Sequence, residues 1–169
     1  MLEQDIIEPS DSEFINPLVI AFKSSGVVRV YLDARQLNNI LKMDHEGTET
    51  IDEILSRCAN IHFMSSFDLN MSFWQVELHE NSRQYTAFLY ERKCYLFKVV
   101  PFGTKVSSAV LCRGTRIAFK CLAKFLISFT DDFLCISQEF EDRIAHLELL
   151  FAACREYGIT LNFKKSKIC

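Results

Sequence analysis

The sequence lacks several features that would place the protein in a membrane, outside the cell or around a zinc ion. It has no signal peptide and no apolar run long enough to span a bilayer, so we expect no membrane partner. None of its seven cysteines forms a Cys-x-x-Cys pair, and none of its four histidines has zinc-ligand spacing. An odd number of cysteines, mostly in apolar runs, favours buried free thiols in a reducing compartment.

Positive charge is also scarce. The chain has 19 Lys and Arg against 22 Asp and Glu, which gives a net charge of −3. This balance argues against a large basic surface for nucleic acid, so any polyanion binding would be local or shared with other segments. With 49% hydrophobic residues and fifteen Phe, the chain of 169 residues has enough apolar material for one domain or subdomain.

Apolar periodicity predicts short strands that alternate with helices. Residues 1–17 are expected to be extended, and Lys23–Gly26 to form a turn. Thr50 and Glu53 have the spacing of a helix capping box, and Ser137 and Gly158 are placed to begin and end a helix. The stripe of that last helix is Phe140, Ile144, Leu147, Phe151 and Cys154. The predicted strands are 18–22, 27–32, 61–67, 84–90, 94–100, 125–127, 133–136 and 159–163, and the predicted helices are 50–59, 105–124 and the one after Ser137. This order predicts an α+β fold, an antiparallel sheet with helices packed on one face.

Two adjacent acids, Asp131 and Asp132, stand at the turn of the predicted hairpin 125–136. A polar turn is the commoner explanation of such a dipeptide. The alternative is a carboxylate cradle for divalent cations, because neighbouring carboxylates repel each other unless a positive charge lies between them. A cradle needs a third carboxylate, and Asp68 at the end of strand 61–67 is the candidate. Arg29 is either a solvated strand residue or a phosphate clamp.

Several segments, in the same order along the chain, resemble motifs of the reverse transcriptases of gypsy-type long-terminal-repeat retrotransposons. The resemblance covers nearly the whole chain, and it implies the fingers–palm fold of a right-hand polymerase. The segments are Val28–Asn38, Phe63–Leu69 with Phe73–Gln75, Phe97–Gly103, Phe129–Asp132 and Leu161–Lys165.

The resemblance implies that residues 1–60 belong to the fingers and 61–169 to the palm, with about 76–104 contributing again to the fingers. We expect the thumb, the connection and the ribonuclease H domain to be absent, and polymerisation to be weak or absent without the thumb. The alternatives are a non-catalytic relic or a host-recruited binding protein with the same fold and, less favoured, another two-metal palm enzyme such as a cyclase.

The implied reaction adds deoxynucleotides to a primer 3′-hydroxyl. Two Mg²⁺ ions about 3.5–4 Å apart, which Mn²⁺ can replace, would stabilise the attacking and leaving oxygens. By resemblance, Asp68, Asp131 and Asp132 hold the metals. Arg29, Leu69, Phe73 and Gln75 bind the deoxynucleoside triphosphate, with Phe73 as the gate against a 2′-hydroxyl. Phe102, Gly103 and Phe129 contact template and primer.

The implied partners are an RNA or DNA template with its primer, deoxynucleoside triphosphates and the rest of a retroelement polyprotein. The implied location is intracellular, in a cytoplasmic particle or the nucleus. Some positions depart from the family pattern. Phe129 lacks the usual tyrosine hydroxyl, Thr130 replaces an apolar residue, and Val28 replaces a tryptophan. None of these changes removes an expected metal ligand.

Overall fold

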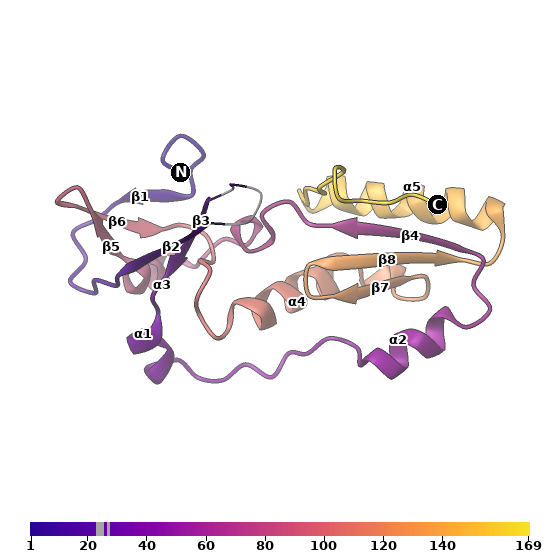
Figure 1. The fold of residues 1–169 in the computed structure, drawn as a ribbon, viewed down its shortest axis with the longest axis horizontal. Helices are drawn as coiled ribbons and strands as arrows, with labels where there is room; N and C mark the ends of the chain where they lie inside the picture. The colour runs from indigo at the N-terminus through magenta and orange to yellow at the C-terminus, as the bar shows by residue number, and fades with distance from the viewer. Residues whose placement is uncertain (23–25, 27) are drawn as a thin grey trace. The chain divides into compact units, whose positions relative to one another are not determined.

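The computed structural model describes residues 1–22, 26 and 28–169 (Figure 1). The chain forms two compact units. The first comprises Met1–Asp44 with Phe73–Ser108, and the second comprises His45–Ser72 with Ala109–Cys169. Residues 45–60, assigned to the fingers by resemblance, therefore group with the second unit. Most of the predicted turn Lys23–Gly26, and Val27 at the start of the following strand, lie outside the described residues.

No helix in the described part of the chain is both long and apolar enough to cross a membrane.

The first unit contains two antiparallel sheets. One pairs β2 with β3, and the other has the strand order β1-β6-β5. Short helical segments connect these strands. The strands are β1 (Ile7–Pro9), β2 (Leu18–Phe22), β3 (Val28–Leu32), β5 (Phe88–Tyr90) and β6 (Lys93–Phe97), and the helical segments are α1 (Arg35–Ile40), α3 (Glu80–Arg83) and the 3₁₀ turns η1 (Ser72–Gln75) and η2 (Gln84–Thr86).

The predicted strand 18–22 exists as β2. Its continuous apolar run predicts a buried strand, and this prediction is wrong. Val19, Ile20 and Phe22 are 49%, 57% and 75% exposed. Within the described residues the strand pairs only with β3, in a two-stranded sheet. Apolar composition predicts a strand, but burial needs a covering layer, and a two-stranded ribbon buries little on its own.

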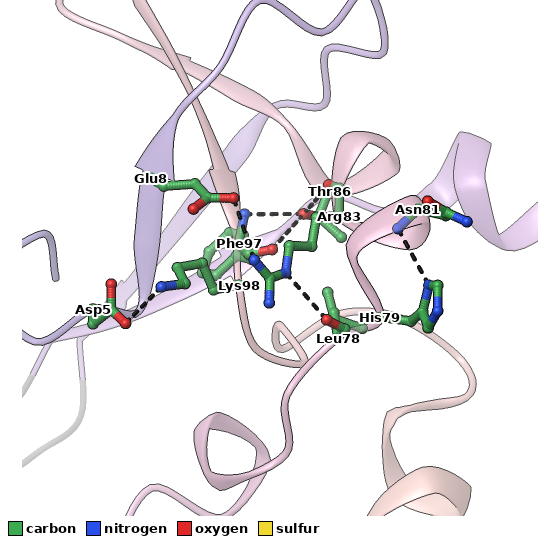
Figure 2. A network of polar contacts seen from close by, with 9 residues as sticks. All are labelled: Asp5, Glu8, Leu78, His79, Asn81, Arg83, Thr86, Phe97 and Lys98. Carbon is green, nitrogen blue, oxygen red and sulfur yellow. Dashed lines mark hydrogen bonds and ion pairs between the residues drawn. The ribbon is translucent and has the colours of Figure 1, made fainter.

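The predicted extended segment 1–17 contains β1, which sequence patterning did not predict. The strand pairs with β6, and two ion pairs, one just before the strand and one within it, hold the segment to the unit. The Nζ of Lys98 lies 2.5 Å from Oδ2 of Asp5, and Nη1 of Arg83 lies 3.5 Å from Oε1 of Glu8 (Figure 2). The amino-terminal segment is therefore part of the first unit's sheet.

The predicted hairpin 84–100 is shorter than expected. Residues 84–86 form η2, so the first strand begins only at Phe88, and the second strand ends at Phe97. Tyr90 pairs with Lys93, which leaves Glu91 and Arg92 as a two-residue turn with φ of 48° and 64°. Both φ values are positive, as in the left-handed turns that match the twist of hairpin strands.

The second unit is built on a three-stranded antiparallel sheet with the order β4-β8-β7. Helix α5 runs along this sheet (Figure 1). The predicted helix 105–124 is in fact α4 followed by a 3₁₀ turn. The strands are β4 (Phe63–Asp68), β7 (Leu126–Phe129) and β8 (Asp132–Ser137), and the helical segments are α2 (Ile51–Cys58), α4 (Ser107–Ala118, whose first two residues belong to the first unit), η3 (Lys120–Leu122) and α5 (Phe140–Glu156).

An aromatic pair identifies the sheet face that the helices cover. Phe67 of β4 and Phe133 of β8 are directly opposite each other and are both 1% exposed. Phe67 packs edge-on against Phe151 of α5 at 5.8 Å, and Phe133 packs against Phe119, which follows α4, at 5.1 Å. Directly opposite residues share one face, so both helical elements cover the same side, and the neighbouring positions point to the other side.

Two predictions about α5 need correction. Ser137 is not the N-cap, because it is the last residue of β8 and its hydroxyl lies 2.8 Å from Nδ1 of His146. The predicted apolar stripe is only partly buried, since Phe140 and Ile144 are 52% and 42% exposed. The buried positions are Leu147, Leu150 and Cys154. Gly158 follows the helix with a φ of 67°, as a C-terminal glycine should.

Helix α2 forms with the predicted capping box, but its apolar residues are not covered. Ile51 and Leu55 are 67% and 63% exposed, and the helix has no buried residue. Arg57 instead connects the helix to the sheet by donating hydrogen bonds to the backbone oxygens of Ala123 and Leu126, at 2.6 and 3.2 Å.

The predicted last strand, 159–163, is not a strand. Residues after Gly158 make only isolated antiparallel bridges, Leu161 to Leu69 and Lys167 to Ser66. They run along the edge of β4 that β8 leaves free. The bridges stay isolated because a turn at residues 162–166 interrupts the pairing.

The cysteines are free thiols, as predicted, but most of them are not buried. Only Cys135 and Cys154 of the seven are buried, and burial raises the pKa of each of these two thiols to about 11.

Candidate active site

The ends of the three strands in the second unit place predicted site residues in one row. Asp68 pairs with Asp132, and Asp132 pairs with Phe129. Because directly opposite residues point to the same face, these three side chains share the side of the sheet opposite Phe67 and Phe133. The structure therefore brings Asp68 and Asp132 together although they lie 64 positions apart in the sequence (132 − 68).

Asp131 lies in the turn beside this row. Thr130 and Asp131 are the two residues between the paired Phe129 and Asp132. The prediction that both acids occupy the turn is therefore half right, because Asp132 already begins β8. The backbone oxygen of Asp131 accepts a hydrogen bond from the N–H of Leu69 at 3.0 Å, so the residues that follow β4 fasten this turn.

Negative charge gathers at the row. The pKa of the Asp132 carboxyl lies above its ordinary value, first because of desolvation and then because of the charges of Asp131 and Asp68. Lys165 opposes this rise. Its Nζ lies 2.5 Å from Oδ2 of Asp68, and the two side chains are 52% and 14% exposed. The residues around Lys165 predict no role for it, because nothing local indicates a partner 97 residues away.

The donor chemistry of the row fits a divalent cation. Carboxylate oxygens are the ligands that Mg²⁺ prefers. The pKa of Asp132 is raised first by desolvation and then by the negative charges of Asp131 and Asp68. The three side chains do not form a ready-made ligand set, since no group of three or more His, Cys, Asp or Glu in residues 1–22, 26 and 28–169 is arranged to hold a metal. One oxygen of Asp68 is directed to Lys165.

In the first unit, other predicted site residues gather around the ring of Phe102. The guanidinium of Arg29 lies 5.8 Å from its centroid, and the ring of Phe73 lies 5.0 Å from it. Tyr31 and Trp74 complete the cluster at 5.5 and 6.2 Å. Arg29 is therefore half-buried, with its guanidinium over an aromatic ring. A fully solvated strand residue, one of the two interpretations of Arg29, would not have this contact.

Gly103 is required by a close backbone approach. Its φ is 116°, and a Cβ at this position would lie 2.1 Å from the backbone oxygen of Leu32. The preceding Phe102 accepts a hydrogen bond from the N–H of Leu32 at 2.8 Å, and Asn38 donates one to the oxygen of Gly103 at 3.0 Å. The Pro-Phe-Gly segment is thus held against β3, which also carries Arg29.

The remaining predicted site residues are Leu69 and Gln75, predicted to bind the nucleotide, and Phe129, predicted to contact template and primer. Leu69 belongs to the second unit and is 4% exposed, so its backbone is the part that could contact a ligand. Gln75 ends η1 and is half-buried in the first unit. Phe129 is 47% exposed at the end of the acidic row. Tyr31 and Trp74 were not among the predicted site residues, although Trp74 adjoins the predicted gate.

The fold and these motifs are those of one protein family. The family model described as reverse transcriptase (RNA-dependent DNA polymerase) matches residues 21–169, so the chain belongs to this family. Solved structures give the same result for the fold. The foamy viral protease-reverse transcriptase in complex with double-stranded DNA matches 99% of this chain with a TM-score of 0.91 and 23% identity, over 29% of its own length. This likeness confirms the predicted α+β fingers–palm fold.

Relatives occur in plant viruses and in a transposon. The enzymatic polyprotein of cauliflower mosaic virus (strain D/H) is 31% identical over 99% of this chain and 26% of its own length. The retrovirus-related Pol polyprotein from transposon 412 of Drosophila melanogaster is 32% identical over 98% of this chain and 14% of its own. The chain thus spans about a quarter or less of the length of these relatives.

Proposed function

We propose that the chain is an RNA-directed DNA polymerase module from a gypsy-type long-terminal-repeat retroelement. The observation that carries the proposal is the row of Asp68 and Asp132 across β4 and β8, with Asp131 in the adjoining turn. A protein with no metal to bind gains nothing from gathering these carboxylates, because each raises the cost of ionising its neighbours. The gypsy-type origin is supported by the similarity to the transposon 412 polyprotein.

The reaction follows from this donor set. The primer 3′-hydroxyl attacks the α-phosphate of a deoxynucleoside triphosphate, a new P–O bond forms, and the bond to pyrophosphate breaks. When bound, two magnesium ions supply positive charge to the attacking and the leaving oxygen. Asp68 and Asp131 are the principal ligands in this proposal, and Asp132 is secondary. Lys165 must release Asp68 before that carboxylate can use both its oxygens as ligands.

The other predicted site residues have separate roles. Arg29 grips the triphosphate through its two-pronged guanidinium, which the ring of Phe102 supports at 5.8 Å. Phe73 excludes a 2′-hydroxyl, while Gln75 and the backbone of Leu69 contribute to nucleotide binding. Phe102, Gly103 and Phe129 contact template and primer. The contact between Phe73 and Phe102 supports this assignment, because it restricts the movement of both rings.

The proposed partners are an RNA or DNA template with its primer, deoxynucleoside triphosphates and other parts of a retroelement polyprotein. Solved relatives with this fold were obtained in complex with double-stranded DNA and with an RNA/DNA hybrid. The relatives in cauliflower mosaic virus and in transposon 412 are polyproteins. We place the chain inside the cell, in a cytoplasmic particle or the nucleus.

Primer extension tests the proposal. The chain is incubated with a primed RNA template, Mg²⁺ or Mn²⁺ and deoxynucleotides, beside the variants Asp131→Asn and Asp142→Asn. Loss of one metal-ligating carboxylate should lower incorporation by at least about a hundredfold, a typical cost of removing a group that stabilises transition-state charge. Asp142 is an exposed acid in the first turn of α5, so its variant controls for the change in net charge.

The result separates this function from the alternative. Incorporation that Asp131→Asn loses and Asp142→Asn keeps supports the polymerase. A folded chain that neither incorporates nucleotide with either metal nor binds Mn²⁺ favours a non-catalytic relic or a host-recruited binding protein. Equal incorporation by all three chains removes Asp131 from the proposed metal site.

A further inference from the structure

Asp68 lies between a negative and a positive neighbour. On one side β8 places Asp132 directly opposite it. On the other side, the segment that follows α5 runs along the free edge of β4, where the N–H of Asn162 donates to the backbone oxygen of Asp68 at 2.8 Å. A turn in that segment brings Nζ of Lys165 to 2.5 Å from Oδ2 of Asp68. The ammonium of Lys165 therefore already forms an ion pair with one of the three clustered carboxylates.

Backbone hydrogen bonds hold the turn that carries Lys165. Ser66 and Lys167 exchange two of them, each 2.8 Å long, across the edge of β4. Within the turn, the oxygen of Asn162 accepts from the N–H groups of Lys165 and Ser166, both at 3.1 Å. None of these bonds uses the ammonium of Lys165, so the turn should keep its place when that side chain is replaced.

The two members of the ion pair differ in their access to solvent. The side chain of Lys165 is 52% exposed, whereas that of Asp68 is only 14% exposed. A lysine with a flexible stem can move its ammonium into water, but Asp68 is held at the end of a paired strand. The pair therefore opens by movement of the lysine, and an arriving cation would find Asp68 in place.

We propose that Lys165 is a displaceable counter-ion of the metal site. In the metal-free chain its ammonium neutralises part of the charge of Asp68, Asp131 and Asp132, and a divalent ion must displace it. The inference rests on the proposed function, since it takes these acids as the metal ligands. It follows that Lys165 stabilises the metal-free fold and weakens metal binding in the absence of substrate.

Metal binding to variants of the turn tests the inference. Mn²⁺ is titrated into the unsubstituted chain, Lys165→Gln, Lys165→Arg and Lys164→Gln, and free Mn²⁺ is read by electron paramagnetic resonance. Lys165→Gln should bind Mn²⁺ about fivefold more tightly, the size expected for a partly exposed ion pair. Lys165→Arg keeps the charge and should bind like the unsubstituted chain. Lys164→Gln alters an exposed neighbour and controls for net charge.

Nuclear magnetic resonance of the unsubstituted chain provides a second test that does not depend on how a variant folds. The side-chain ammonium of Lys165 should give a signal displaced from that of a solvated lysine, and Mg²⁺ should move it to the solvated position. The signal of Lys164 should stay unchanged in the same titration.

Two results overturn the inference, and they are distinguishable. If Lys165→Gln binds Mn²⁺ no more tightly than Lys164→Gln, or if Mg²⁺ leaves the Lys165 signal unmoved while it binds, the counter-ion role is wrong and the polymerase site stands. If neither the unsubstituted chain nor Lys165→Gln binds Mn²⁺, the proposed metal site and the counter-ion role fail together.

Discussion

Thr130 is the most strained residue of the acidic turn. Its φ of 58° is in the left-handed region, which a β-branched side chain rarely adopts. The two-residue connection between β7 and β8 requires this conformation, because such hairpin turns use left-handed backbone to match the twist of their strands. The protein therefore keeps an unfavourable residue one position before a proposed metal ligand.

Replacing Thr130 should release that strain. Asn adopts the left-handed region more readily than Thr, so Thr130→Asn is expected to raise the free energy of unfolding by about 1 kcal/mol. Urea denaturation of the two chains measures the change. Thr130→Val retains the branched Cβ and is the control. An Asn variant no more stable than the Val variant would show that the turn carries no steric cost.

Helix α2 shows how an element can form without burying its apolar side chains. Thr50 Oγ1 accepts a hydrogen bond from the N–H of Glu53 at 3.3 Å, and Oε2 of Glu53 accepts one from the N–H of Thr50 at 2.7 Å. With no buried residue in the helix, these caps and the hydrogen bonds of Arg57 to residues 123 and 126 carry most of its stability.

Removing the cap should therefore loosen α2 selectively. Thr50→Ala is expected to cost the helix about 1 kcal/mol, which corresponds to roughly fivefold faster amide hydrogen exchange over residues 52–58. Mass spectrometry of exchanged peptides measures the rate. Ser56→Ala, an exposed change inside the helix, should leave the exchange rate equal or lower. Uniform acceleration over the second unit would contradict a local role for the cap.

Across the molecule, the strands differ greatly in burial. Phe133, Cys135 and Ile136 of β8 are 1%, 3% and 5% exposed, whereas Phe22 of β2 is 75% exposed. β8 is the central strand of its sheet, while β2 and β3 form a two-stranded sheet in the part of the chain that the structure describes. Protection from exchange depends on such burial and pairing, so the two units should open with different free energies.

Hydrogen exchange of the whole chain tests this difference. We expect the amides of β8 to exchange at least about tenfold more slowly than those of β2 and β3, because opening β8 exposes the aromatic core of its unit. Peptides from β4, which pairs with β8, should follow β8. Equal protection in β2 and β8 would mean that the chain opens as one cooperative unit.

The sequence alone determined what depends on local spacing and on residue chemistry. The capping box of α2, the position of Gly158 and the strands on either side of Asp131 follow from residues within a few positions of one another. The motifs also led to the family and its fold, and they identified the three acids as candidates.

Tertiary structure alone decided which surfaces are covered and which distant residues meet. The apolar run of β2 predicts burial, and Ile51, Ile54 and Leu55 share one face of α2, but coverage depends on packing partners that no local pattern encodes. The register that sets Asp68 opposite Asp132, and the turn that brings Lys165 to the same carboxylate, join residues far apart in the chain. Such contacts arise only when the backbone folds, because their energy depends on distance in space and not on separation along the sequence.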